Sequence, residues 1–149
     1  MPPIVRRYIK TSFLFLVAGL LLGGYILLAE FAVGRYPSRL FITAHVHLLL
    51  VGFMLMIVMG VATWMFPRAG RDDARYRPAL AEAVYWIMTI GTALRAISEV
   101  VAAGVTEGTA ILRALIVVGG SAQLMGALLF VLNMWWRVRM PVTPPPPAP

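Results

Sequence analysis

The chain has 149 residues, of which 60% are hydrophobic and only 13% are charged, and its mean hydropathy is +0.84. Soluble domains usually carry about 25% charged residues, so this composition excludes a water-soluble or secreted domain. The net charge of +7 comes largely from basic residues at the ends of apolar runs, where they would face lipid headgroups. The sequence therefore predicts a lipid bilayer, and no nucleic acid, as its partner. Because the chain has no cysteine, it has no disulfides, thiolate chemistry or iron–sulfur clusters.

Four apolar runs are long enough to cross the hydrocarbon core of a bilayer, which requires about 20 residues. They cover residues 11–33, 40–66, 79–103 and 109–136. The first run follows three basic residues, but it is too long for the core of a signal peptide and lacks a cleavage site. We therefore expect an all-α integral membrane four-helix bundle over residues 1–140. The proline-rich tail, 141–149, should be extended.

The positions of the basic residues predict the orientation of this bundle. If the amino terminus is cytoplasmic, nine basic residues lie on the inside and only Arg35 and Arg39 lie on the outside. The nine are Arg6, Arg7, Lys10, Arg68, Arg71, Arg75, Arg77, Arg137 and Arg139. Since basic residues accumulate in cytoplasmic loops, both termini should be cytoplasmic. Trp64, Trp86, Trp135 and Trp136 then fall near the cytoplasmic ends of the helices, as interfacial anchors do.

The second run contains the only two histidines of the chain, His45 and His47. Two positions along a helix differ by about 200°, so the two rings should face opposite sides and serve different neighbours. Each imidazole has two interpretations: a hydrogen bond to an adjacent helix, or axial ligation of a haem iron. Gly52 lies seven residues after His45, where a missing side chain would let a flat macrocycle lie against the helix or would allow close helix packing. Gly19 and Gly23 in the first run form a GxxxG pattern, which is typical of helix packing.

Further polar residues are expected in the same outer layer of the bundle. Arg39 begins the second run, Arg95 and Glu99 are four residues apart in the third, and Arg113 is early in the fourth. Arg95 and Glu99 would neutralise each other as a structural pair. Alternatively, the arginines would bind the propionates of a haem, because a guanidinium group binds a carboxylate through two hydrogen bonds. Polar residues in the fourth run are expected to form hydrogen bonds between helices, and Gln123 could also contact a cofactor; they are Ser121, Gln123 and Asn133.

Residues 44–68, AHVHLLLVGFMLMIVMGVATWMFPR, resemble the tenth helix of subunit I in the haem–copper oxidase superfamily. The resemblance is to the C-type cytochrome c oxidases and the nitric oxide reductases, in which an HVH opens this helix. Residues 81–108 are similar to the eleventh helix and the loop after it, and residues 119–139 are similar to the last helix. Nearly the whole chain would then correspond to the last four helices of that subunit, and the resemblance implies that His45 and His47 ligate two different haems.

The chain departs from that family in residues that its chemistry requires. A low-spin haem in the family takes a second histidine from another helix, and the oxygen site takes three further histidines and a crosslinked tyrosine. His45 and His47 are the only histidines here, so the resemblance does not imply a stand-alone terminal oxidase. It implies a protein that binds haem b (iron) as a homo-oligomer or as a subunit of a respiratory-type membrane complex.

The sequence supports three hypotheses for the function. The first is a b-type haem protein of the bacterial inner membrane, which transfers electrons or senses or binds a small gas, O2 or NO. The second, from a different class, is an accessory or assembly subunit that binds no cofactor. The third is a protein that delivers a metal or haem.

The predicted topology can be tested by labelling single cysteines, because the chain has none of its own. A cysteine at Ala74 should be labelled only from the cytoplasmic side of intact cells, and one at Gly34 only from the opposite side, because nine of eleven flanking basic residues lie on the Ala74 side. Labelling of Ala74→Cys by an impermeant reagent added outside would contradict this topology.

Overall fold

The computed structural model describes residues 1–66, 77–105, 109–135 and 137–139, and within these ranges the chain is helical and has no strands. The all-α class expected from the sequence is therefore confirmed. Four helices are long and apolar enough to cross a membrane: Pro3–Ala32, Arg39–Met65, Pro78–Gly104 and Ala110–Trp135. The proline-rich tail and the loop residues Arg68, Arg71 and Arg75 lie outside the described residues.

Two of these four helices change their pitch along their length. The first consists of α1 (Pro3–Leu27) and the π-helical turn η1 (Leu28–Ala32), and the second consists of α2 (Arg39–His47), the π-helical segment η2 (Leu48–Leu55) and α3 (Met56–Met65). The others are α4 (Pro78–Gly104) and α5 (Ala110–Trp135), and a short 3-10 segment, η3 (Arg137–Arg139), comes after α5. A π-helical segment inside an α-helix is rare and is frequent at functional sites; η2 begins directly after His47.

The first helix starts at Pro3, eight residues before the apolar run that predicts it. Proline is favourable in the first turn of a helix, because its fixed φ suits the helix and the backbone N–H that it lacks would have no partner within the helix there. The basic residues Arg6, Arg7 and Lys10 therefore lie within the first turns of α1.

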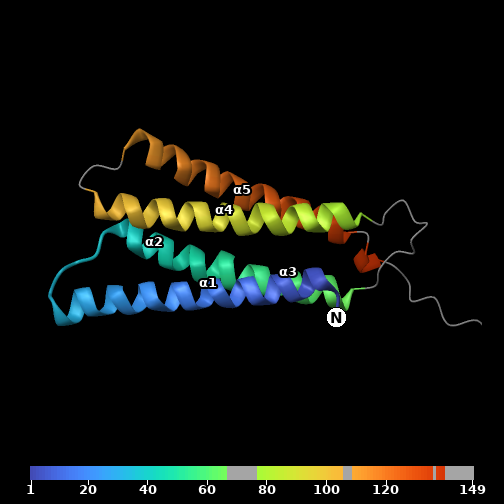
Figure 1. Cartoon of the computed structure of the whole chain (residues 1–149), viewed down its shortest axis with the longest axis horizontal. Coiled ribbons are helices and arrows are strands. Elements are labelled where there is room, and N and C mark those ends of the chain that lie inside the picture. Colours follow the sequence, from blue (N-terminus) through green and yellow to red (C-terminus); the bar gives the residue numbers. More distant parts are fainter. Residues whose placement is uncertain (67–76, 106–108, 136, 140–149) are drawn as a thin grey trace, which may run out of the picture.

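The helices run antiparallel to their chain neighbours (Figure 1). α1 packs along η2 and α3, α2 packs against α4, and α5 packs chiefly against α4, so α1 and α5 are the two outer helices. We call the end that holds the amino terminus and the end of α3 the amino-terminal end. We call the opposite end, where α2 and α5 begin, the histidine end.

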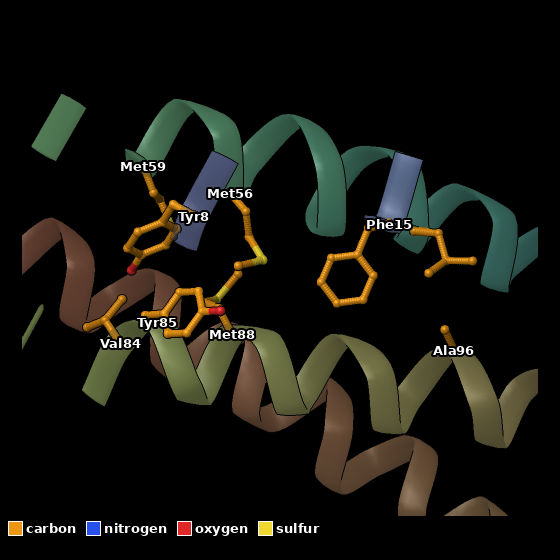
Figure 2. Packing of buried hydrophobic residues seen from close by; sticks show 9 residues of the cluster. Tyr8, Phe15, Met56, Met59, Val84, Tyr85, Met88 and Ala96 are labelled. Carbon is orange, nitrogen blue, oxygen red and sulfur yellow. The ribbon is translucent and has the colours of Figure 1, made fainter. Parts of the chain in front are cut away.

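The hydrophobic core lies between α1, the second helix and α4. Figure 2 shows Tyr8 and Phe15 of α1 beside Met56 and Met59 of α3, with Tyr85 of α4 facing them. The rings of Tyr8 and Tyr85 meet edge to face, with 5.1 Å between their centroids. The remaining buried members of this cluster are Leu48, Val84, Met88 and Ala96. Because methionine side chains are flexible, they fill the irregular space between three helices.

Outside this core, the helices expose apolar rather than polar surface. Leu14 and Leu21 of α1 are 70% and 71% exposed, and Ile111 of α5 is 71% exposed. The buried residues, by contrast, include six polar or charged ones: Ser12, Thr63, Thr92, Ser98, Glu99 and Gln123. In water this arrangement would expose large apolar faces without cover, whereas in a lipid bilayer the same faces would contact acyl chains.

Glycines allow α4 and α5 to approach closely. A Cβ at Gly119 would lie 2.8 Å from the backbone nitrogen of Arg95, and a Cβ at Gly91 would lie 2.8 Å from the Cβ of Ala122. Farther along, Arg137 of η3 donates hydrogen bonds to the carbonyls of Thr63 (3.0 Å) and Phe66 (2.7 Å) at the end of α3. These carbonyls have no partner within the helix, so Arg137 caps α3 and connects the end of the α4–α5 pair to the first two helices.

Gly119→Ala should lower the free energy of unfolding in detergent by about 1–3 kcal/mol, because the added methyl group separates α4 from α5. The matched control is Gly24→Ala in α1, where a Cβ would meet nothing within 4 Å. That control should be neutral or stabilising by up to about 1 kcal/mol, since alanine favours the helix. Equal stability of the two variants, measured by denaturant titration, would contradict this packing.

Candidate functional site

His45 lies in the contact between α2 and α1. Its Nδ1 is 2.8 Å from the carbonyl oxygen of Gly19, and the ring lies over Gly23, where a Cβ would be 2.6 Å from the ring Cε1. Only glycine leaves enough room for an imidazole ring at this helix contact. The Gly19–Gly23 pattern thus accommodates a histidine from α2 as well as bringing two helices together.

His47 faces away from α1, toward α4. Its Nδ1 is 2.8 Å from the carbonyl oxygen of Thr43, one turn earlier in α2, and 4.0 Å from Oε2 of Glu99. The His47 side chain is 20% exposed, while the Glu99 side chain is 1% exposed. The two histidines therefore reach different neighbours, as their two-residue spacing predicts.

Both hydrogen bonds fix the same tautomer of the imidazole. A carbonyl oxygen can only accept, so Nδ1 must carry the proton in His45 and in His47. In the neutral ring, Nε2 then has a lone pair and no proton. Ligating histidines in metalloproteins are usually held in this way, with one ring nitrogen bonded to a carbonyl or carboxylate and the other directed at the metal.

Arg95, Glu99 and Gln123 form a polar network between α4 and α5. Arg95 donates from Nε to Oε1 of Glu99 at 3.0 Å and from Nη1 to Oε1 of Gln123 at 3.3 Å. Gln123 in turn donates from Nε2 to the hydroxyl of Thr92 at 3.2 Å. The guanidinium group lies against Gly120, where a Cβ would be 3.0 Å from Nη1. The expected pairing of Arg95 with Glu99 is thus present, and Gln123 and Thr92 extend it into α5 and back to α4.

The second oxygen of Glu99, Oε2, is buried and has no hydrogen-bond partner in the described part of the chain. A buried carboxylate oxygen without a partner costs free energy. Nδ1 of His47 lies 4.0 Å from this oxygen, beyond hydrogen-bond distance. His47 and Glu99 are therefore two neighbouring polar groups inside an apolar bundle, and the buried Glu99 oxygen is left unsatisfied among the described residues.

The remaining residues predicted for the site do not join this cluster. Gly52 faces α1 as His45 does, but the Phe15 ring occupies the space beside it, and a Cβ at Gly52 would be 2.7 Å from Phe15 Cβ. In this structure Gly52 therefore allows close packing of α1 against the second helix. Arg39 and Arg113 are both exposed near the histidine end, at the beginnings of α2 and α5. Arg95 alone among the three predicted arginines is part of the network.

The donor set restricts the ligands that this site can hold. The described residues contain no group of three or more histidine, aspartate and glutamate side chains that could hold a bare metal ion. A haem iron needs only one or two protein ligands, because the porphyrin supplies four nitrogens. A single imidazole with a free Nε2 fits that requirement, whereas the filled space at Gly52 offers no flat surface for a macrocycle.

No protein-family model matches the chain, and neither a curated protein nor a solved structure matches it.

The buried ion pair can be tested by removing one partner or both. Arg95→Met should lower the free energy of unfolding by about 3–5 kcal/mol, because it leaves the Glu99 carboxylate buried without a counter-charge. Arg95→Met combined with Glu99→Leu should recover most of this loss. Arg39→Met, which changes an exposed arginine, should stay within about 0.5 kcal/mol of wild type. Additive losses in the double variant would contradict the pairing.

Proposed function

We propose that the chain is a multi-pass protein of the bacterial inner membrane with both termini in the cytoplasm. The apolar outward faces of α1 and α5 and the buried polar network support insertion into a bilayer. The orientation is supported by the excess of basic residues and exposed tryptophans at the amino-terminal end. Trp64 is 59%, Trp86 48% and Trp135 53% exposed, as residues of an interfacial belt would be.

We further propose that the protein binds haem b and that His47 is its axial ligand. The observation that carries this proposal is the hydrogen bond from Nδ1 of His47 to the Thr43 carbonyl, which leaves Nε2 with its lone pair on a partly exposed ring. A bound haem would supply an iron that exchanges one electron or binds O2 or NO. The resemblance of residues 44–68 to the tenth helix of oxidase subunit I supports the same function.

His45, the other candidate ligand, lies against α1. Its ring packs closely at Gly19 and Gly23, so ligation by His45 would require α1 to move away. Because the two rings also face different helices, one haem cannot take both as axial ligands within one chain. A six-coordinate haem would therefore need a ligand from a second copy or from another subunit, which favours a homo-oligomer or a respiratory-type complex.

The propionates of such a haem would lie toward the histidine end. Arg39 and Arg113 are exposed there, while Arg95 is held in its pair with Glu99. A guanidinium group is suited to bind a propionate through two hydrogen bonds. Arg39 and Arg113 are thus the residues of this chain that would orient the propionates.

A second candidate function is a cofactor-free accessory subunit, and the contact at Gly52 favours it. Phe15 fills the space that a macrocycle would need beside Gly52, and both imidazoles already have a hydrogen-bond partner. In that case the exposed faces of α1 and α5 would pack against other membrane subunits. This function predicts a colourless protein that assembles into a larger complex.

Absorption spectra of the purified protein, oxidised and then reduced, test the haem proposal. The wild type, expressed with ample haem, should show a Soret band and give a b-type pyridine haemochrome. His47→Gly should lose this band, and imidazole added to the buffer should restore it, since it can take the place of the missing ring. His45→Ala should keep the band but lower the free energy of unfolding by about 1–3 kcal/mol, because it removes a buried hydrogen bond and packing against α1.

Wild-type protein that is folded but colourless would reject the haem proposal in favour of the accessory subunit. A Soret band that persists unchanged in His47→Gly and disappears in His45→Ala would transfer the ligand role to His45.

A further inference from the structure

The amino-terminal end of α1 presents two exposed cations on one face. Arg6 and Lys10 are both exposed and are four residues apart, so their side chains are neighbours on the helix surface. Two like charges at this spacing repel each other and destabilise a helix unless an anion lies between them. Arg7, between them in sequence, is turned to α4 and forms an ion pair with Glu82.

The acidic side chain that the structure places at this end is already engaged. The Glu82 carboxylate accepts from Arg7 and, through Oε1, from Trp86 Nε1 at 3.2 Å. The other described acidic residues, Glu30 and Glu99, lie toward the histidine end of α1 and α4. Within the described ranges, therefore, the charges of Arg6 and Lys10 are not balanced by the protein.

The same face of α1 continues beyond Lys10 as an exposed apolar strip. At 100° per residue, the strip residues lie within about 60° of the direction of Arg6 and Lys10. Their side chains are 50–71% exposed: Phe13, Leu14, Val17 and Leu21. Two cations thus stand at the end of an apolar strip that extends along α1 toward the middle of the bundle.

We propose that this face of α1 binds an anionic phospholipid, whose phosphate lies between Arg6 and Lys10 and whose acyl chains lie along the apolar strip. This inference rests on the proposed insertion into a bilayer and is independent of haem. Two cations followed by an apolar strip match the phosphate and the acyl chains of a phospholipid, whereas a free phosphate would leave the strip uncovered. A headgroup with a net negative charge, such as phosphatidylglycerol, fits the two cations better than a zwitterionic one.

Native mass spectrometry of the full chain in detergent, titrated with phosphatidylglycerol or phosphatidylcholine of identical acyl chains, tests this site. The wild type should bind phosphatidylglycerol more tightly. Arg6→Gln or Lys10→Gln should each weaken that binding by about fivefold, and the double variant by about 25-fold, because each cation contributes similarly near an anionic headgroup. Arg6→Lys with Lys10→Arg, which keeps both charges, should bind as the wild type does.

The matched control is Arg35→Gln with Arg77→Gln, which removes two exposed cations outside this face, one from each end of the bundle. It should leave the affinity for phosphatidylglycerol unchanged. An equal loss in the control would show diffuse electrostatic attraction rather than a site on α1 and would overturn the inference, as would equal binding of the two lipids by the wild type.

Extraction of cell membranes at alkaline pH separates this inference from the proposal on which it rests. A chain that is released from the membrane overturns both. A chain that stays in the membrane but shows no preference for phosphatidylglycerol overturns only the lipid site. Because the substituted residues are exposed, far-ultraviolet circular dichroism of all variants should match the wild type.

Discussion

The ion pair between Arg95 and Glu99 lies where α4 meets both α2 and α5, and its burial is the electrostatic constraint that this part of the bundle has to satisfy. A carboxylate that is 1% exposed requires a counter-charge, and Arg95 supplies it from one turn away on the same helix. Gly119 and Gly120 let α5 approach α4 closely, and Gln123 of α5 then accepts a further hydrogen bond from the Arg95 guanidinium group. Arg95 thus links the buried Glu99 carboxylate to Gln123 of α5, across a helix contact that the glycines keep close.

Glycines also allow close packing between α1 and the second helix, where they make room for an imidazole and a phenyl ring rather than for an ion pair. Gly19 and Gly23 of α1 leave room for the His45 ring of the second helix, and the Gly19 carbonyl accepts its hydrogen bond. In the opposite direction, Gly52 of the second helix leaves room for the Phe15 ring of α1. Residues without side chains therefore determine how deeply the larger ones on the facing helix can insert. In the bilayer that we propose for this bundle, lipid provides no hydrophobic drive for helices to associate, so such close contacts and the hydrogen bonds within them would hold the helices together.

The sequence predicted the features that depend on a single helix. Length and hydropathy gave the four long helices, and helical spacing gave the opposite directions of His45 and His47 and the pairing of Arg95 with Glu99. The features that it did not predict depend on which faces of different helices meet. The GxxxG pattern of α1 predicted a helix contact, but no residue near it in the sequence indicated that a histidine ring would pack there. The π-helical segment after His47 has no residue signal that we can identify.

The two histidines show why neighbouring helices, rather than residue type, decide between structure and chemistry. Both rings have the same tautomer and both donate to a carbonyl at 2.8 Å. His45, however, bonds to the Gly19 carbonyl of α1 and packs over Gly23, so its hydrogen bond joins α1 and α2. His47 bonds within its own helix, so its hydrogen bond joins no two helices, and it faces a Glu99 oxygen that has no hydrogen-bond partner among the described residues. A buried polar atom that has no hydrogen-bond partner among the described residues calls for an explanation, and the ligand binding proposed above would supply one.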